Sequence, residues 1–244
     1  MKKIIFTLLF ASSIILTAQE KEEKTFTLSG SVDTYFRGNI SGGNFDTAPG
    51  SSFANQPGFA LGMINLIAGY EGEKVGFVAD MVYGPRGADA VFGSPAGSAQ
   101  IVNQLYAYWN VSEKVTLTLG NFNTFLGYEV ISPTANFNYS TSYLFSYGPF
   151  SHTGIKADIA LSENTSLMLA VMNPTDATEF NPTGNYAFGA QLGFSGQYIN
   201  FLLDNGAYEI DFTGGFDLSE TFFLGVNAAY FSGDDAPGFY GAAL

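Results

Sequence analysis

The sequence predicts an all-β protein, a transmembrane antiparallel up-and-down β-barrel with about 11 to 12 strands. Three observations predict it. Segments of about ten residues alternate apolar and polar side chains, the connections between them alternate long and short, and the composition is rich in glycine and aromatic residues. The 244 residues include 29 Gly, 24 Phe and 14 Tyr, but only 13% are charged. Many short strands joined by glycine-rich turns produce such a composition.

The N-terminus has the layout of a secretory signal peptide. Lys2 and Lys3 precede an apolar run at 4–16, and small residues follow it as far as Ala18. The run is too short to span a bilayer as a helix, which takes roughly 20 apolar residues. The predicted organisation is a signal peptide at 1–18, a periplasmic spacer at 19–24 and an outer-membrane barrel domain at 25–244.

Charge and cysteine content exclude several kinds of partner. Cleavage removes Lys2 and Lys3 from 9 basic residues and leaves 7 against 22 acidic ones, a formal charge of −15. Such a chain is not expected to bind nucleic acid. Without cysteine it can form neither a disulfide nor a thiolate metal site.

The segment at 208–217 shows the alternation most clearly. Its apolar side holds Tyr208, Ile210, Phe212, Gly214 and Phe216, and its polar or small side holds Glu209, Asp211, Thr213, Gly215 and Asp217. Ten residues at about 3.4 Å each, tilted by about 45°, rise roughly 23 Å, which is close to the apolar band of a membrane barrel. We therefore expect one face to meet lipid and the other to meet water.

Connections on the two sides of the predicted strands differ in length. Strands are predicted at 25–38, 58–70, 75–83, 99–111, 115–122, 151–161, 166–173, 186–194, 198–204, 208–217 and 222–231. Long connections fall at 39–57, 84–98, 123–150 and 174–185, and short turns separate the other pairs, with only 205–207 short where a long one is expected. Bacterial barrels show this asymmetry, with short turns in the periplasm and long loops outside. The alternative is a soluble β-sandwich that binds carbohydrate, but that fold does not require long and short connections to alternate.

Aromatic residues gather at the predicted strand ends, which favours interfacial girdles. They are Tyr70 and Trp109 on the turn side and Tyr83, Tyr186, Tyr208 and Tyr230 on the loop side. The general preference of aromatic residues for strands is the alternative explanation.

The C-terminal end leaves the strand count open. The last clear strand ends near residue 231, which gives an odd number, whereas bacterial single-chain barrels close with an even number. We therefore expect a barrel truncated at the C-terminus. In the alternative, 239–244 begins a twelfth strand and a small barrel closes.

Several stretches of the chain form a recognisable set of motifs: SGSVDTYF at 29–36, VNQLYAYW at 102–109, GNF at 120–122 with GYE at 127–129, and FNYS at 137–140 continuing to FSHTG at 150–154. Together they resemble the OmpL-like β-barrel porin family of Bacteroidota-type outer membranes. The resemblance covers most of 25–231. It implies an outer-membrane porin with more strands than this chain holds, and it carries over no catalytic or binding residues.

Charged residues on the polar faces are candidates for the pore wall, because a Lys or Arg facing lipid at mid-depth costs about 2 to 4 kcal/mol. The predicted pore-lining set is Asp33, Arg37, Lys156, Asp158, Glu209, Asp211 and Asp217. Acid-rich walls favour cations, so a weak cation preference is expected. In the alternative, Arg37 pairs with a nearby carboxylate and only stiffens the wall.

The segment at 123–150 is the longest and most aromatic connection, and it would promote aggregation if it were wholly exposed. We expect it to fold inward and narrow the pore, with Glu129, Tyr128 and Tyr139 near the constriction. Packing on the outer rim is the alternative.

Catalysis is not expected, and neither is a cofactor or a metal site. His152 is the only histidine, and a triad with Ser151 or a metal site needs further partners. Asp234 and Asp235 fall short of a calcium coordination set.

The sequence therefore predicts a porin-like channel through which small hydrophilic solutes diffuse passively. Its expected partners are outer-membrane lipid and those solutes. A homo-oligomer is possible, and the sequence does not give the number of copies. The alternative is a non-conducting barrel that anchors or binds a surface ligand through its long loops.

Overall fold

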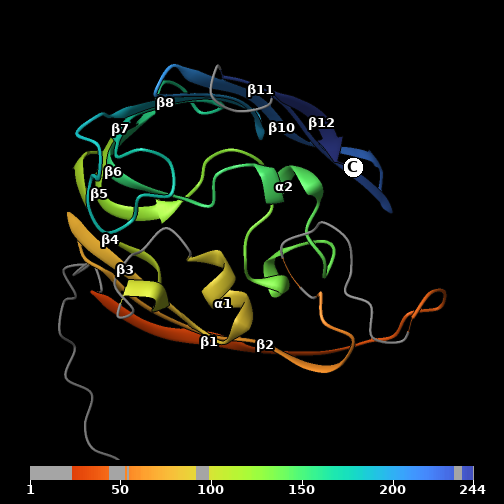
Figure 1. Ribbon diagram of the computed structural model, residues 1–244. Coiled ribbons are helices and arrows are strands. Elements are labelled where there is room, and N and C mark those ends of the chain that lie inside the picture. The colour runs from red at the N-terminus through yellow and green to blue at the C-terminus, as the bar shows by residue number, and fades with distance from the viewer. Residues whose placement is uncertain (1–23, 44–52, 54, 92–98, 234–237, 244) are drawn as a thin grey trace, which may run out of the picture.

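The protein forms one curved antiparallel sheet of twelve strands (Figure 1). The computed structural model describes residues 24–43, 53, 55–91, 99–233 and 238–243, so the predicted signal peptide and most of the spacer lie outside the described residues. The strands are β1 (Thr25–Arg37), β2 (Gly58–Glu71), β3 (Val75–Tyr83), β4 (Val102–Ser112), β5 (Val115–Asn123), β6 (Ser151–Ala160), β7 (Thr165–Met172), β8 (Ala187–Phe194), β9 (Gln197–Asp204), β10 (Ala207–Ser219), β11 (Phe222–Ser232) and β12 (Phe239–Ala243).

Each strand pairs with the next one in the chain, from β1 to β12 without a crossover. This topology confirms the all-β, up-and-down architecture and excludes the two-layer sandwich. The twelfth strand of the alternative prediction exists as β12, but no ladder among the described residues joins it to β1, so the small closed barrel of that alternative is not formed there. The predicted strand at 99–111 begins three residues late, because Ala99–Ile101 form a 3-10 turn, η1.

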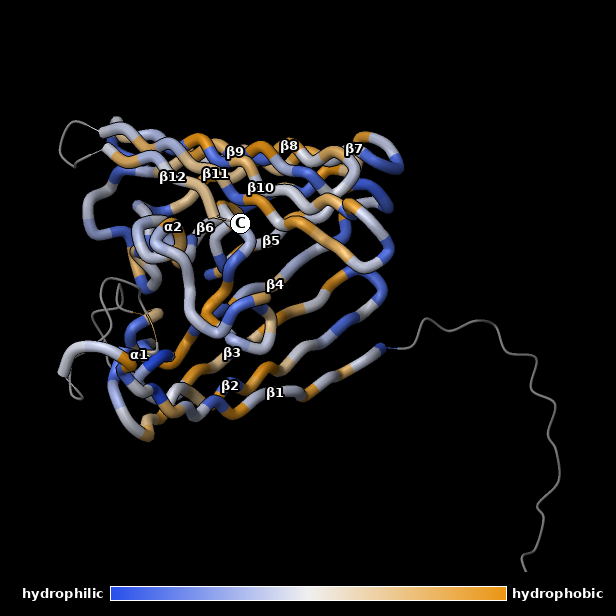
Figure 2. The backbone as a smooth tube through the Cα atoms, turned by 90° about the vertical axis from the view of Figure 1, so that its right-hand side faces the viewer, coloured by the Kyte–Doolittle hydropathy of each residue, from blue (hydrophilic) through white to orange (hydrophobic). Residues whose placement is uncertain are grey.

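The outer face of the sheet is apolar. In β1 the outward positions include Phe26, Leu28, Val32 and Phe36, each of them more than 60% exposed. Colour alternates between hydrophobic and hydrophilic along the strands in Figure 2. Five of the predicted interfacial aromatic residues are exposed near strand ends: Tyr83, Trp109, Tyr186, Tyr208 and Tyr230. The sixth, Tyr70, is half-buried and stacks on Phe77. The sheet thus offers lipid an apolar surface, which is what the two-residue period predicts.

Two short helices lie on the concave side of the sheet: α1 (Pro85–Ala90), which follows β3, and α2 (Tyr143–Tyr147), which belongs to the segment between β5 and β6 (Figure 1). We call this segment, residues 124–150, the inner loop; it also contains the 3-10 turn η2 (Pro133–Ala135). No helix of the described residues is long and apolar enough to cross a membrane. Ser142 caps α2 by accepting a hydrogen bond from the Phe145 backbone N–H at 3.2 Å.

The buried apolar side chains form two clusters inside the curve of the sheet. One joins the inner loop to α1 and to β2 and β3, and contains Phe53, Met63, Val82, Ala90, Val91, Ile131, Phe145 and Phe150. The other joins the start of the inner loop to β7–β9, and contains Phe122, Leu126, Met168, Ala170, Met172, Ala187 and Leu202. Phe145, Phe150 and Phe125 of the inner loop therefore pack inside the curve of the sheet and not on its outer rim. Phe137, Tyr143 and Tyr147 of the same loop stay exposed.

Gly120 in β5 has a backbone that other residues rarely adopt. Its φ is +137°, and a Cβ there would overlap the carbonyl oxygen of Leu105 in β4. We predict that Gly120→Ala lowers the free energy of unfolding by about 2 to 3 kcal/mol or prevents folding, because strained φ values and steric overlap add. Urea titration monitored by tryptophan fluorescence measures the change.

The matched control is Gly225→Ala in β11, where a Cβ would make only ordinary contacts at 3.7 and 3.8 Å. If Gly120→Ala and Gly225→Ala unfold at the same urea concentration, the backbone explanation for Gly120 is wrong.

Candidate functional site

All seven predicted pore-lining residues occupy positions on the inner faces of β1, β6 and β10, but they differ in access to solvent. Asp33, Glu209 and Asp211 are 7%, 5% and 1% exposed, so other residues cover them. Lys156 and Asp158 keep 24% and 44% of their side chains exposed. Arg37 is half-buried, and Asp217 is exposed at the turn end of β10. That the set lines a conducting path stays a prediction.

Asp211 joins the inner loop to three strands. Its Oδ1 accepts hydrogen bonds from the Gly127 backbone N–H at 3.0 Å, from Asn200 Nδ2 at 2.6 Å and from Thr213 Oγ1 at 2.9 Å. Its Oδ2 accepts one from Asn227 Nδ2. A buried carboxylate with this number of donors is compensated for the loss of water. Asp211 therefore fixes the first turn of the inner loop against β9, β10 and β11.

A second anchor lies on the opposite wall, where the Tyr139 hydroxyl donates to Asp33 Oδ1 at 2.8 Å. Arg86 of α1 lies beside this pair, only 3% exposed, and its Nε donates to the Ile131 carbonyl at 2.6 Å. Its guanidinium also stands 4.6 Å from the centre of the Phe53 ring. Burial lowers the pKa of Arg86, while the nearby Asp33 carboxylate favours the charged form. Burial raises the pKa of Tyr139, and the hydrogen bond to Asp33 acts in the same direction.

Glu129 and Tyr128 have different surroundings, although both were expected near a constriction. The Glu129 carboxylate accepts from the Ser142 backbone N–H at 2.7 Å and from the Ser142 hydroxyl, so it holds the inner loop to itself. The Tyr128 ring packs edge-on against Phe137, with 6.1 Å between centroids, and Tyr128 also lines a cavity between the inner loop and the wall.

That cavity has a volume of about 550 Å³ and lies between the inner loop and strands β4–β6 and β8–β10. We call it the lumen cavity. Its walls consist mainly of hydroxyl, amide and aromatic side chains: Gln104, Tyr106, Tyr108, Thr116, Thr118, Phe122, Asn123, Thr124, Phe125, Tyr128, Lys156, Gln191, Tyr198 and Thr213. Lys156 is the one charged member of this lining. The surface offers hydrogen bonds to water and to polar solutes without a strong field of either sign.

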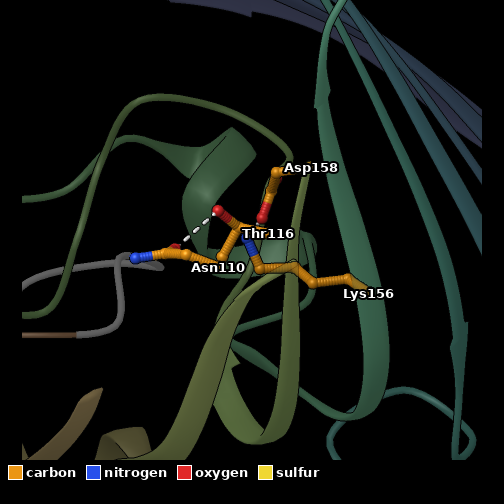
Figure 3. A network of polar contacts seen from close by, with 4 residues as sticks. All are labelled: Asn110, Thr116, Lys156 and Asp158. Atoms are coloured by element: carbon orange, nitrogen blue, oxygen red, sulfur yellow. Dashed lines mark hydrogen bonds and ion pairs between the residues drawn. The ribbon is translucent and has the colours of Figure 1, made fainter. Parts of the chain in front are cut away.

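Lys156 is paired on the same strand. Its Nζ lies 2.7 Å from Asp158 Oδ2, and the ammonium also stands 5.6 Å from the centre of the Phe122 ring. Figure 3 shows the two side chains converging beside Thr116, whose hydroxyl donates to Asn110 Oδ1 at 2.9 Å. The registers place Asp158 opposite Thr116, and Thr116 opposite Asn110, across β6, β5 and β4. The pair therefore leaves this part of the wall nearly neutral.

Arg37 and His152, two further candidate residues, are held by contacts within the protein. Arg37 Nη1 donates to the Asn55 carbonyl at 3.2 Å. His152 is 1% exposed, and its Nε2 lies 3.0 Å from Thr124 Oγ1. The centre of its ring lies 6.3 Å from that of Phe122 and 5.1 Å from that of Phe125. Asp234 and Asp235 lie outside the described residues.

The sequence pattern missed two buried charges. Arg86 stands among the small residues of a glycine-rich connection. The sequence contains only one other arginine, Arg37, and this rarity was the signal that could have drawn attention to Arg86. Asp80 interrupts the apolar run of β3 and accepts from Asn103 Nδ2 at 2.7 Å, from Gln104 Nε2 at 3.2 Å and from Asn65. Both residues turn inward, and period-two parity could have placed Asp80 there.

Comparison with known proteins decides the family. The family described as "Putative beta-barrel porin-2, OmpL-like" matches residues 25–243, which span the sheet from the start of β1 to the end of β12. The chain belongs to this family. Among curated proteins, none matches it.

Family membership agrees with the apolar outer face and the polar inner face. It makes the chain a β-barrel porin of the outer membrane, with a general role in transport and a surface in contact with lipid. Such a role implies a channel rather than a catalyst. The family does not specify the solute, so the solute class has to be argued from the inner face of this porin.

Removal of the Asp211 carboxylate tests the anchor of the inner loop. We predict that Asp211→Ala destabilises the porin by about 3 to 5 kcal/mol, because it leaves several buried donors without an acceptor. It should also expose the inner loop to proteases. Urea titration and limited proteolysis in detergent measure the two effects.

Asp217→Ala is the control, since it removes an exposed acid from the same strand. The anchor role is refuted if Asp211→Ala is as stable and as protease-resistant as Asp217→Ala.

Proposed function

We propose that the chain is a channel for the passive diffusion of small hydrophilic solutes across the outer membrane, with a weak preference for cations. Porin family membership supports the general role. The observation that carries the finer proposal is the lumen cavity of about 550 Å³, bounded by polar inward side chains. A solute that leaves water needs replacement hydrogen bonds, and the tyrosine, threonine and amide groups of this cavity offer them.

The charge of the inner face supports a weak preference only. Five of the seven predicted pore-lining residues are acidic, which favours cations. Three of these acids are covered, however, and a fourth, Asp158, is paired with Lys156 at 2.7 Å. The fifth, Asp217, is exposed at the turn end of β10. Covered and paired charges contribute less to the potential that a permeating ion experiences.

The inner loop is proposed to narrow the channel. Asp211 on β10 anchors its beginning, and Asp33 on β1 binds its middle through Tyr139. The loop is thus tied to two strands far apart in the sheet. Tyr128 faces the lumen cavity. Glu129 has a different part in this proposal, because its carboxylate is bonded to Ser142 and shapes the loop.

Replacement of residues 128–147 by a short Gly-Ser linker tests the constriction. We predict a larger single-channel conductance in a planar bilayer, because the segment that occupies the lumen is gone. Retained heat-dependent mobility in gel electrophoresis shows that the shortened barrel has folded. An unchanged conductance of that folded barrel would contradict the constriction.

The pair Lys156 and Asp158 tests ion preference with opposite signs. Lys156→Gln leaves an unpaired carboxylate in the lumen and should shift the reversal potential in a KCl gradient toward that of potassium. Asp158→Asn leaves an unpaired ammonium and should shift it toward that of chloride. The shifts should shrink at high salt, because screening weakens exposed charges.

Equal reversal potentials for the two variants would show that this part of the wall does not face the ion path. If the folded wild-type chain passes no current at all, the channel proposal fails and the non-conducting barrel that binds a ligand through its loops takes its place.

A further inference from the structure

We propose that the loop end of the lumen contains a binding site for a small organic ammonium ion, formed by Glu209 and Asp204 together with the aromatic side chains of Phe231, Phe239 and Tyr147. These residues line a second cavity, of about 400 Å³, separate from the lumen cavity. We call it the acidic cavity. The site adds a ligand to the proposed function but does not depend on conduction.

Glu209 is the central observation. It is 5% exposed on the inner face of β10, and within the described residues no hydrogen bond or ion pair engages its carboxylate. Its cross-strand neighbours are Leu202 on β9 and Phe231 on β11. A buried carboxylate between two apolar side chains is costly unless something compensates for the lost water. Buried Asp211, two residues away, shows the usual compensation, with four donors.

Two more carboxylates line the same cavity and add to its negative charge. Asp204, at the end of β9, accepts from the Thr175 backbone N–H at 2.7 Å through Oδ2, while its Oδ1 is buried without a partner among the described residues. Asp176 accepts from the backbone N–H groups of Phe150 and Ser151, both at 2.9 Å. Burial raises the pKa of the Asp176 carboxyl to about 6, and the charge of Asp204 adds to that rise. Among the described residues, the lining of this cavity holds three carboxylates and no lysine, arginine or histidine side chain.

The other walls of the acidic cavity are aromatic. Phe231 and Phe239 are cross-strand partners on β11 and β12, and their rings stack with 5.2 Å between centroids. Tyr147 of α2 approaches from the other side, 6.0 Å from the Phe239 ring. Leu202, Glu209, Phe231 and Phe239 thus form one lateral row across four strands, and Tyr147 faces the end of that row. Ring faces attract cations, and organic ammonium ions are recognised by this combination of rings and carboxylates.

An organic cation fits these walls better than a metal ion does. Calcium takes six to eight oxygen ligands at about 2.3 to 2.6 Å, and magnesium holds most of its water. In the described part of the chain, no three acidic or histidine side chains are grouped closely enough to hold a metal. The three carboxylates are spread around an apolar, aromatic space, which suits a charged group with methyl or methylene substituents. An anion would meet uncompensated repulsion.

Choline and its neutral isostere, 3,3-dimethyl-1-butanol, are the probes that test the site. The folded protein is prepared in dodecyl maltoside, because a phosphocholine detergent would compete with the probe. Isothermal titration calorimetry should give saturable binding of choline and none of the neutral alcohol. Glu209→Gln should weaken choline binding by about tenfold or more, since it removes the central charge but keeps the shape.

Stability separates a binding role of Glu209 from a structural one. Because its carboxylate has no partner, Glu209→Gln should leave the urea midpoint unchanged or raise it, whereas a structural carboxylate would give a lower midpoint. Glu220→Gln, in the exposed turn at the opposite end of the β10–β11 hairpin, is the matched control and should bind choline as the wild type does.

Equal binding of choline and its neutral isostere, equal affinities of the Glu209 and Glu220 variants, or preferential binding of calcium would each overturn the site. None of these results bears on conduction, which the bilayer recordings test separately.

Discussion

The structure depends on the backbone hydrogen bonding that an apolar surrounding demands. A strand in lipid has no water to bond, so its N–H and C=O groups have to pair with neighbouring strands. The uninterrupted ladder order from β1 to β12 meets this demand through the described sheet. The two-residue period follows from it, because a paired strand presents alternate side chains to opposite faces. Outward positions such as Val32 and Phe36 are therefore apolar, while inward ones such as Asp33 and Asp211 can be charged.

The inward charges raise a second requirement, since a covered carboxylate needs donors as much as the backbone does. The inner loop supplies some of them. Its Gly127 N–H donates to Asp211, and its Tyr139 hydroxyl donates to Oδ1 of Asp33. The segment that folds inward thus supplies donors that the strands of the sheet do not. Phe145 and Phe150 of the same loop pack against Phe53, which adds apolar burial to the polar anchors. The inner loop and the sheet thus pack as one unit, and the proposed constriction follows from that packing.

Glu209 differs from the other covered acids in its lack of hydrogen-bond donors among the described residues, and this difference supports the proposed site in the acidic cavity. Asp33, Asp80 and Asp211 each accept hydrogen bonds from neighbouring side chains, whereas Glu209 lies between Leu202 and Phe231. Polar groups that cost stability are concentrated at sites of binding and transport. The lumen cavity, by contrast, has hydroxyl and amide walls and a neutralised Lys156, which fits passage rather than tight binding.

The sequence alone indicated the strands, their order and the two-residue alternation of the clearest segments, because pairing in lipid imposes a period and a length that appear directly in the chain. It also indicated that the aromatic segment at 123–150 folds inward, and Phe145 and Phe150 are indeed buried there. It placed Asp33 and Asp211 on the inner face but not beneath the inner loop, and it did not reveal Arg86 beside Asp33 or the row from Leu202 to Phe239. The curvature of the sheet and the path of the loop bring the inner loop and Arg86 to Asp33 and Asp211, and the registers of β9 to β12 set the row from Leu202 to Phe239. Contacts between residues about 100 positions apart, such as Tyr139 with Asp33, leave no local pattern, so tertiary structure decides which charges are covered, paired or left without a partner.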